Sequence, residues 1–248
     1  MSRWVKIGGI AVGTLVVVLV VVFMFLLSSL DGLIEAAVEK FGSEATRTRV
    51  TLNNVDISPT SGTGTMSGLF VGNPKGYKTK SAFELGSISV KIDISTITSD
   101  VILIKEIVIT KPVVTYELGP GGNNIDVIKK NVNAYAGAER KQQKGKGKSA
   151  GDGGGGKKLI IEHLYIRGGT VNVSSAMLKG KKLSSGLPTI HLRNIGKKKG
   201  GASPGEVVEK IIGSISRSVT KSVSSLGIGK ALKEGASGVG SKVKGLFK

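Results

Sequence analysis

Few side chains of this 248-residue sequence are suited to catalysis or metal binding. There is no cysteine, which excludes a thiol nucleophile, a thiolate zinc site and an iron–sulfur cluster. The two histidines, His163 and His191, fall in two different predicted strands. Neither has a histidine or acidic partner at a metal-ligand spacing such as H-x-x-x-H. We therefore predict no metal site and no cofactor.

The carboxylates that could act as general acids or bases are scattered along the predicted strands, mostly opposite apolar positions. They are Asp56, Glu84, Asp93, Glu106 and Glu117. A glycosidase needs two such groups facing one another, and nothing in the spacing pairs them. The chain also contains no G-x-S-x-G motif and no serine beside a plausible base. We expect solvated strand faces here and no enzymatic activity.

The chain is strongly basic, with 36 Lys and Arg against 17 Asp and Glu and a net charge of +19. Residues 1–136 are nearly neutral at +2, whereas residues 137–248 carry +17. Such an excess indicates nucleic acid, anionic lipid or acidic partners. A nucleic-acid reader usually places stacking aromatic rings among its basic residues, and the second half has only Tyr165 and Phe247. We expect anionic lipid, a membrane or an acidic protein as partner, and no nucleic acid.

Residues 7–30 contain no charged side chain and predict a transmembrane anchor. As a helix, these 24 residues would span roughly 36 Å, enough to cross a hydrocarbon core of roughly 30 Å. The segment is longer than the apolar part of a secretory signal and is followed by a poor cleavage site, so we expect it to stay uncleaved. Arg3 and Lys6 precede it and acidic residues follow it. Residues 1–6 should therefore be cytoplasmic, with the rest of the chain on the other side of a single membrane crossing.

A juxtamembrane amphipathic helix is predicted over residues 31–42. Its apolar residues recur at helical spacing and comprise Leu30, Leu33, Ile34, Ala37, Val38 and Phe41. Asp31, Glu35 and Glu39 fall on the opposite face, and Gly42 is a candidate C-cap. We expect the apolar stripe to pack on the protein's own folded domain, with a partner-binding helix as the alternative.

From Thr48 the apolar residues recur at every second position, as in a β-strand. Residues 48–136 therefore predict a β domain with a closing helix. The clearest strand alternates apolar and polar residues from Ile88 to Ile94. A slip in the alternation at Asn53-Asn54 predicts a bulge. Asn123 or Asn124 can cap the closing helix. The fold class is therefore α+β, mostly β.

An internal repeat is predicted at a separation of 57 residues. Residues 104–116 and 161–173 share the pattern I-x-x-[IL]-x-I-x-x-[PG]-x-V-x-[YV]. Pro112 in the first copy and Gly169 in the second mark the same break, where a strand turns or bulges. A sheet built by adding the same strand–break–strand unit again would produce this pattern.

The second half divides into four parts. Residues 137–157 predict a flexible Gly/Lys-rich linker, and 158–196 continue the β domain. Residues 203–225 predict a basic amphipathic helix, whose start is marked by the capping-box features of Ser203-Pro204-Gly205-Glu206. Residues 226–248 form a Gly/Ser/Lys tail. Either this helix and tail lie on an anionic membrane surface, or the helix docks on the sheet and the tail is disordered and solvated. The candidate residues for an anionic surface are Lys197, Lys198, Lys199, Lys210, Arg217 and Lys221.

Several stretches resemble the N-terminal region of AsmA-like proteins. These are the helix after the membrane anchor, the run S-G-L-F-V-G-N-P-K-G-Y at residues 67–77, and L-G-S-I-S-V at residues 85–90. Residues 104–117 are similar to that family's recurring unit of an element, a proline and a strand. The resemblance covers residues 7–135 and, loosely, 158–195.

This resemblance implies an inner-membrane protein of Gram-negative bacteria whose curled antiparallel sheet lies in the periplasm with flanking helices. Larger members are thought to carry phospholipid acyl chains along an apolar groove toward the outer membrane and to support its assembly. About eight strands at about 4.8 Å each reach only roughly 40 Å. We therefore expect a short groove within a larger assembly. Its predicted lining is Val90, Ile92, Ile94, Ile107, Ile109, Val114 and Tyr116.

Two other interpretations stay open. The chain could be a membrane-anchored scaffold or assembly factor with a closed core, whose basic second half binds an anionic surface or an acidic partner. Asn73-Pro74 is also similar to plant-type stress-protein β-sandwiches, which leaves such a sandwich behind a membrane anchor as a third possibility. An open apolar trough along the sheet would favour lipid handling, and a closed core would favour the scaffold.

Overall fold

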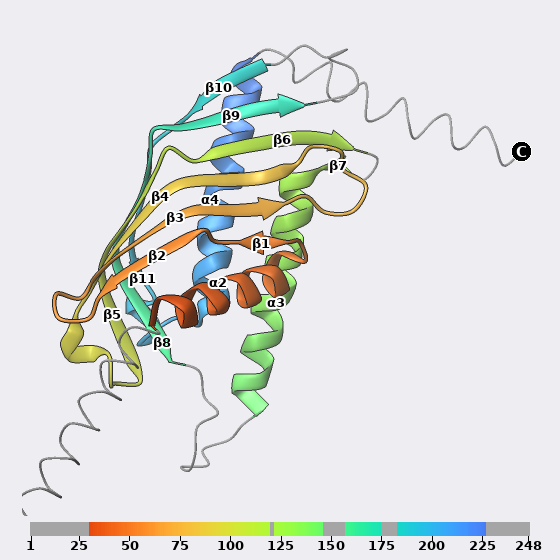
Figure 1. Cartoon of the computed structure of the whole chain (residues 1–248). Helices are drawn as coiled ribbons and strands as arrows, with labels where there is room; N and C mark the ends of the chain where they lie inside the picture. The colour runs from red at the N-terminus through yellow and green to blue at the C-terminus, as the bar shows by residue number, and fades with distance from the viewer. Residues whose placement is uncertain (1–29, 120–121, 146–156, 175–182, 227–248) are drawn as a thin grey trace, which may run out of the picture.

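The computed structural model describes residues 30–119, 122–145, 157–174 and 183–226. They form a fold of mixed α and β structure, mostly strands, in which the sheet curls like half of a barrel and holds the helices on its concave side (Figure 1). The prediction of an α+β, mostly β fold with a curled sheet is confirmed at this level.

The helices are α2 (Leu30–Thr46), α3 (Asn124–Gly145) and α4 (Pro204–Ser225), with short 3₁₀ turns η1 (Ile94–Thr96) and η3 (Lys197–Lys199). The strands are β1 (Val50–Thr51), β2 (Asn54–Ser58), β3 (Thr63–Gly72), β4 (Ser81–Ile92), β5 (Val101–Thr110), β6 (Val113–Gly119), β7 (Gly122–Asn123), β8 (Lys158–Arg167), β9 (Gly169–Ser174), β10 (Leu183–Leu187) and β11 (Ile190–Ile195).

The sheet is mixed, which corrects the prediction of an antiparallel one. β5 runs parallel to β8 and β6 runs parallel to β9, while the other described pairs are antiparallel. Parallel neighbours require a crossover connection, and α3 lies in the connection between β6 and β8. The alternation of apolar and polar residues indicates which face of a strand is exposed to solvent. It carries no information on the direction of the neighbouring strand.

The parallel pairs are the two copies of the internal repeat lying side by side. Each residue of β5 or β6 is 57 positions from its partner in β8 or β9, as in Ile104 with Ile161 and Val114 with Val171. Both copies break at the same point, where Lys111 (φ 50°) and Gly168 (φ 65°) adopt left-handed conformations. The predicted repeat is confirmed, because the second copy extends the sheet directly against the first.

The break continues across the other strands, so the sheet bends along one line. β3 has a left-handed residue, Gly68 (φ 68°), where its partner strand is interrupted between β1 and β2. Asn53 lies in that interruption and donates its N–H to the Ser67 carbonyl at 3.2 Å. The predicted bulge at Asn53-Asn54 is wrong, because β1 and β2 pair with β3 in the same register on both sides of the interruption and no extra residue is inserted. On the far side, the bend falls between β10 and β11, at Pro188.

One cluster of buried apolar side chains joins the concave face of the sheet to the helices. Val114 of β6 and Leu164 of β8 are fully buried, as are Ile128 of α3 and Val219 of α4. α3 packs on β6, and α4 packs on β8 to β11. The concave face is therefore covered by helices over the part of the sheet that the repeat builds.

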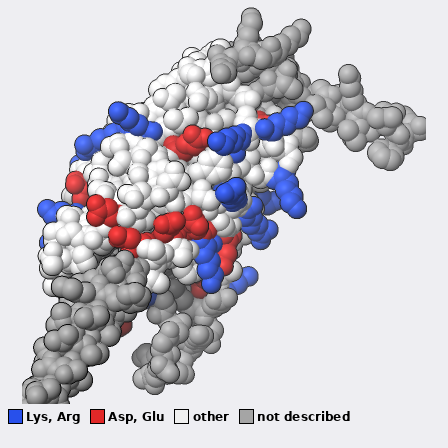
Figure 2. Space-filling model, in the orientation of Figure 1, with Lys and Arg blue, Asp and Glu red and all other residues white. Residues whose placement is uncertain are grey.

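α2 docks on the sheet in a different way from that predicted. Its acidic face lies on the edge formed by β1 and β2, where Asp31 accepts a hydrogen bond from the Ile57 N–H at 3.1 Å. Figure 2 shows Asp and Glu side chains in a band across this face, where Figure 1 places α2. The apolar stripe is consequently divided: Leu33 and Phe41 are 62% and 52% exposed, whereas Ile34, Ala37 and Val38 are half-buried. The expectation that these two side chains pack on the domain is wrong, because the edge N–H groups attract the carboxylates.

The ends of α2 and α3 also differ from the predictions. α2 continues through Gly42, where a β-carbon would lie 3.0 Å from Val50 Cγ1. Arg47 (φ 55°) adopts the left-handed conformation after the helix.

α3 begins at Asn124 as predicted but runs to Gly145, into the segment expected to be a linker. Contacts with α4 explain the extension, because Glu139 accepts a hydrogen bond from Ser203 Oγ at 2.6 Å. Residues 146–156 lie outside the described part.

α4 confirms the predicted capping box. Ser203 Oγ accepts from the Glu206 N–H at 3.2 Å, and Glu206 Oε2 accepts from the Ser203 N–H at 3.1 Å. Both contacts satisfy N–H groups that a helix start leaves without intrahelical partners. The predicted tail lies beyond the described residues, apart from Leu226, which packs on the core.

No helix of the described residues is both long and apolar enough to cross a membrane. The predicted anchor at 7–30 and the N-terminus at 1–6 fall outside those residues, except that Leu30 begins α2.

Candidate functional site

The candidate site is a cavity of about 630 Å³ at the seam where the edge strand β11 faces helices α3 and α4. Five consecutive residues, from Leu192 to Gly196, line it on the strand side. Successive side chains of a strand point to opposite faces, so a cavity lined by consecutive residues lies along the strand's edge. The opposite walls come from α3 and α4, with η3 at one end.

The cavity is rich in positive charge. Its lining includes seven basic residues, Lys129, Arg140, Arg193, Lys198, Lys199, Lys210 and Arg217. The two acidic residues, Glu206 and Glu209, leave a formal excess of five positive charges (seven minus two). Like charges held around one concave space raise the local potential and favour an anionic occupant.

Both acidic residues are already engaged. Arg140 Nη1 lies 2.8 Å from Glu209 Oε2, and this hydrogen bond raises the pKa of Arg140 above its ordinary value. Arg140 and Lys199 both lie near Glu206 Oε1, at 3.7 and 3.6 Å. Of the seven basic residues, only Arg140 and Lys199 take part in the ion pairs that the described residues form. Lys129 and Lys210, on the two helices that line the cavity, are among the five that have no carboxylate partner in that set.

The residues predicted to contact an anionic surface are only partly brought together. Lys198, Lys199, Lys210 and Arg217 line the cavity, whereas Lys197 and Lys221 do not. Adjacent positions on one 3₁₀ turn cannot all point one way, which separates Lys197 from its neighbours. Both omitted residues give matched controls for the experiments below.

Three basic residues of the cavity were missed by the sequence reasoning. They are Lys129 and Arg140 of α3 and Arg193 of β11. A helical signal was available for the first two, because Lys129, Asn133 and Arg140 fall on one helix face beside the buried stripe. No signal indicated that α3 would pack beside α4, since this contact joins segments about 70 residues apart.

The predicted lipid-groove residues separate into three environments. Ile109 and Val114 are 6% and 0% exposed and belong to the closed core under the helices. Ile94 lies in η1, outside the sheet, and is 47% exposed. The structure therefore does not place these three side chains along one open groove.

The other predicted groove residues are half-buried. Val90 and Ile107 pair across β4 and β5, and Ile92 pairs with Ile104 one step further along. Tyr116 lies on β6, beyond the bend, and burial is the largest cause that raises the pKa of its hydroxyl. Only the β4–β5 group forms a contiguous, partly open apolar surface.

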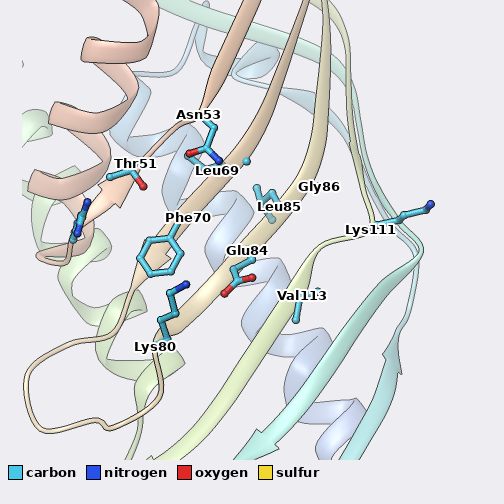
Figure 3. A pocket seen from close by; sticks show the side chains of 12 residues that line it. Thr51, Asn53, Leu69, Phe70, Lys80, Glu84, Leu85, Gly86, Lys111 and Val113 are labelled. Carbon is cyan, nitrogen blue, oxygen red and sulfur yellow. The ribbon is translucent and has the colours of Figure 1, made fainter.

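A second depression, of about 530 Å³, lies near the bend of the sheet, on the face that points away from the buried core (Figure 3). Phe70 and Glu84 pair across β3 and β4 there, on the face away from the buried Phe83. Lys80 lies over the Phe70 ring at 5.8 Å, and Figure 3 shows Lys111 pointing away from the other side chains. With fewer basic residues and an exposed carboxylate, it is a weaker anion site than the cavity beside β11.

The two histidines, which the sequence leaves unrelated, lie together on the solvent side of β8 and β11. His163 Nδ1 is 3.1 Å from His191 Nε2, and the Tyr165 and His191 rings stack at 4.1 Å. Arg167 covers the other side of Tyr165, also at 4.1 Å. Desolvation first, and then Arg193, His163 and Arg167, lower the pKa of His191. Only the pairing of β8 with β11 brings these residues into contact.

Within the described residues, no group of three or more His, Cys, Asp or Glu side chains is arranged to hold a metal ion. Comparison with protein-family models and with curated proteins found no match to this chain.

Proposed function

We propose that this protein is a non-enzymatic, membrane-anchored scaffold or assembly factor that captures an anionic partner in the cavity beside β11. One observation carries the proposal: seven basic side chains surround a single cavity whose only two acidic residues are engaged in ion pairs. Lys129 and Lys210 would supply part of the attraction, because no described carboxylate pairs with either.

The arrangement favours capture over chemistry. A bound anion would be met by several ammonium and guanidinium groups, which provide charge-assisted hydrogen bonds and speed encounter at low salt. The two carboxylates of the lining, Glu206 and Glu209, are engaged in ion pairs with Arg140 and Lys199. The consequence is affinity that falls as ionic strength rises, since partly exposed charges are screened.

Membrane anchoring is the second part of the proposal. Residues 7–30 would cross the inner membrane once with residues 1–6 in the cytoplasm, so that the folded part lies in the periplasm. A single anchor would concentrate the cavity near the membrane, where anionic lipids and envelope proteins are both available. Epitope accessibility on either side of the membrane tests this orientation.

The capture proposal is tested by charge reversal on the full chain in neutral detergent. We expect Lys129→Glu/Lys210→Glu to weaken binding of a labelled polyglutamate peptide or of phosphatidylglycerol vesicles at least about tenfold. Lys197→Glu/Lys221→Glu makes the same change in net charge outside the cavity and should have little effect. Equal loss in both double variants, or no binding of either probe, would contradict the proposal.

A second candidate function is the handling of phospholipid acyl chains, as in the AsmA-like proteins that the sequence resembles. The observation in its favour is the half-buried apolar group on β4 and β5, which includes Val90, Ile92 and Ile107. A photo-crosslinker at Ile92 should then label acyl chains in membranes, whereas one at the fully buried Val114 should not. Absence of labelling from Ile92 would exclude this candidate.

A further inference from the structure

The two edges of the sheet are not covered to the same extent. A free edge strand presents unpaired N–H and C=O groups that can pair with another chain, and proteins usually cover them. Along β1 and β2, α2 covers the edge: Asp31, Glu39 and Ser43 accept hydrogen bonds from the N–H groups of Ile57, Leu52 and Val50 at 3.1, 2.9 and 3.1 Å.

At the opposite side of the sheet, α4 packs on both edge strands but forms a side-chain hydrogen bond to the backbone of only one of them. Ser222 Oγ donates to the Gly186 carbonyl of β10 at 2.9 Å. β11 pairs with β8 on one side, and no backbone hydrogen bond from another described residue reaches its other side. The uncovered edge of β11 is the strand wall of the basic cavity.

We propose that an extended acidic polypeptide segment binds in this cavity by adding a strand to the free edge of β11. This inference rests on the capture function proposed above and names its partner. Two features of one place support it: an unpaired strand edge, which recognises a peptide backbone, and the surrounding excess of positive charge, which selects acidic side chains.

The geometry limits how the segment would bind. Asn194 (φ 53°) departs from strand conformation, so regular pairing would extend over Ile190 to Arg193, and only Leu192 and Arg193 of this stretch line the cavity. A pairing of this length supplies few hydrogen bonds, and the basic residues must provide much of the affinity. Side chains of the added strand would alternate, with every second one directed toward Lys129, Lys210 and Arg217 on the helices.

A lipid head group would use the same positive charge but has no backbone to pair with β11. The two occupants therefore differ in one measurable property, the need for peptide N–H groups on one side of the ligand. In a strand, alternate residues direct their N–H groups to the same side. N-methylation of one alternate set of residues in a peptide ligand removes the N–H groups that would donate to β11. N-methylation of the other set removes the N–H groups that face away from β11.

The test uses the full chain in neutral detergent and the peptide acetyl-(Glu-Thr)₃-amide in three forms: unmodified, N-methylated at every Glu, and N-methylated at every Thr. We expect the unmodified form to bind and one methylated form to bind about tenfold or more weakly, because it loses two or more hydrogen bonds. The other methylated form should bind like the unmodified peptide. Amides of Ile190 to Arg193 should also become more protected from hydrogen exchange when the peptide binds.

Equal binding of all three peptides, abolished by Lys129→Glu/Lys210→Glu, would overturn strand addition but leave anion capture intact. Binding of phosphatidylglycerol vesicles through the same two lysines, without binding of the unmodified peptide, would also overturn it and assign the cavity to lipid head groups. Loss of all binding, peptide and vesicle alike, would remove the proposed function itself.

Discussion

At the scale of single residues, the bend of the sheet depends on a few positions with unusual backbone conformation. Gly68 is the most constrained of these, because its φ is 68° and a β-carbon built there would lie 2.6 Å from Asn53 Nδ2. At Gly137 in α3, by contrast, a β-carbon would meet nothing within 4 Å. The same substitution should therefore have opposite effects at the two glycines.

Gly68→Ala should lower the free energy of unfolding by about 1–3 kcal/mol, through left-handed strain and the contact with Asn53. Gly137→Ala should raise it by about 0.5–1 kcal/mol, because alanine loses less backbone entropy in a helix. Chemical denaturation followed by circular dichroism measures both. A Gly68→Ala variant as stable as the wild type would mean that the strands do not bend at this residue.

Desolvation of His191, together with the nearby charges of Arg193, His163 and Arg167, lowers its pKa and makes stability depend on pH. In the unfolded chain, the His191 imidazole takes up a proton near its ordinary pKa of 6.5, but in the folded protein it does so only at lower pH. The unfolded state therefore binds more protons in that window, and stability should fall as the pH drops below 6.5. NMR titration should report the lowered pKa of His191, and His191→Gln should flatten part of the pH dependence. A His191 pKa at or above 6.5 would contradict the prediction.

At the scale of secondary-structure elements, α2 shows how local pattern and tertiary contact can disagree. Its sequence predicts an amphipathic helix, which is correct, and an inward apolar stripe, which is wrong for Leu33 and Phe41. The carboxylates dock instead because edge N–H groups of β1 and β2 need acceptors. Helical periodicity identifies two faces, but the neighbouring element decides which one is covered.

Glu39→Ala should destabilise the protein by about 1–2 kcal/mol, because the N–H of Leu52 loses its acceptor at a partly buried site. Glu39→Gln should cost less, since the amide oxygen can still accept. Glu35→Ala is the matched control, because Glu35 makes no hydrogen bond to the described strands. Hydrogen exchange at Leu52 should accelerate in Glu39→Ala alone. Acceleration in neither variant would show that α2 does not protect this edge.

At the scale of the whole molecule, the two halves of the chain form one folding unit despite their difference in charge. β8 and β9 pair directly with β5 and β6, and α4 packs along α3. Ile104 and Ile161 lie side by side in the same buried cluster. Removing one half would expose apolar surface of the other, so neither should be stable alone.

A fragment of residues 1–145 should therefore lack a cooperative unfolding transition and bind a hydrophobic dye. Adding residues 146–248 in trans should restore the transition, because the missing strands and α4 complete the core. Thermal unfolding of each fragment and of the mixture measures this. A fragment of 1–145 that unfolds cooperatively by itself would show that the repeat's first copy is an independent domain.

The positions of strands, the capping box of α4 and the repeat at 57 residues follow from the sequence, because each depends on residues close together or on a pattern that recurs. The parallel direction of the repeat copies, the extension of α3 to Gly145 and the pairing of the two histidines do not. They depend on contacts between segments far apart in the chain, which leave no local periodicity.

The sequence by itself determined that this protein is a basic, mostly β chain with a predicted membrane anchor, and that Lys and Arg concentrate in its second half. Tertiary structure alone decided that α3 contributes Lys129 and Arg140 to the same cavity as α4, and that β11 is left with an uncovered edge there. Charge is a sum over residues and can be counted along the chain. A binding site requires that charge to converge on one surface, and the packing of helices against the edge of the sheet determines that convergence.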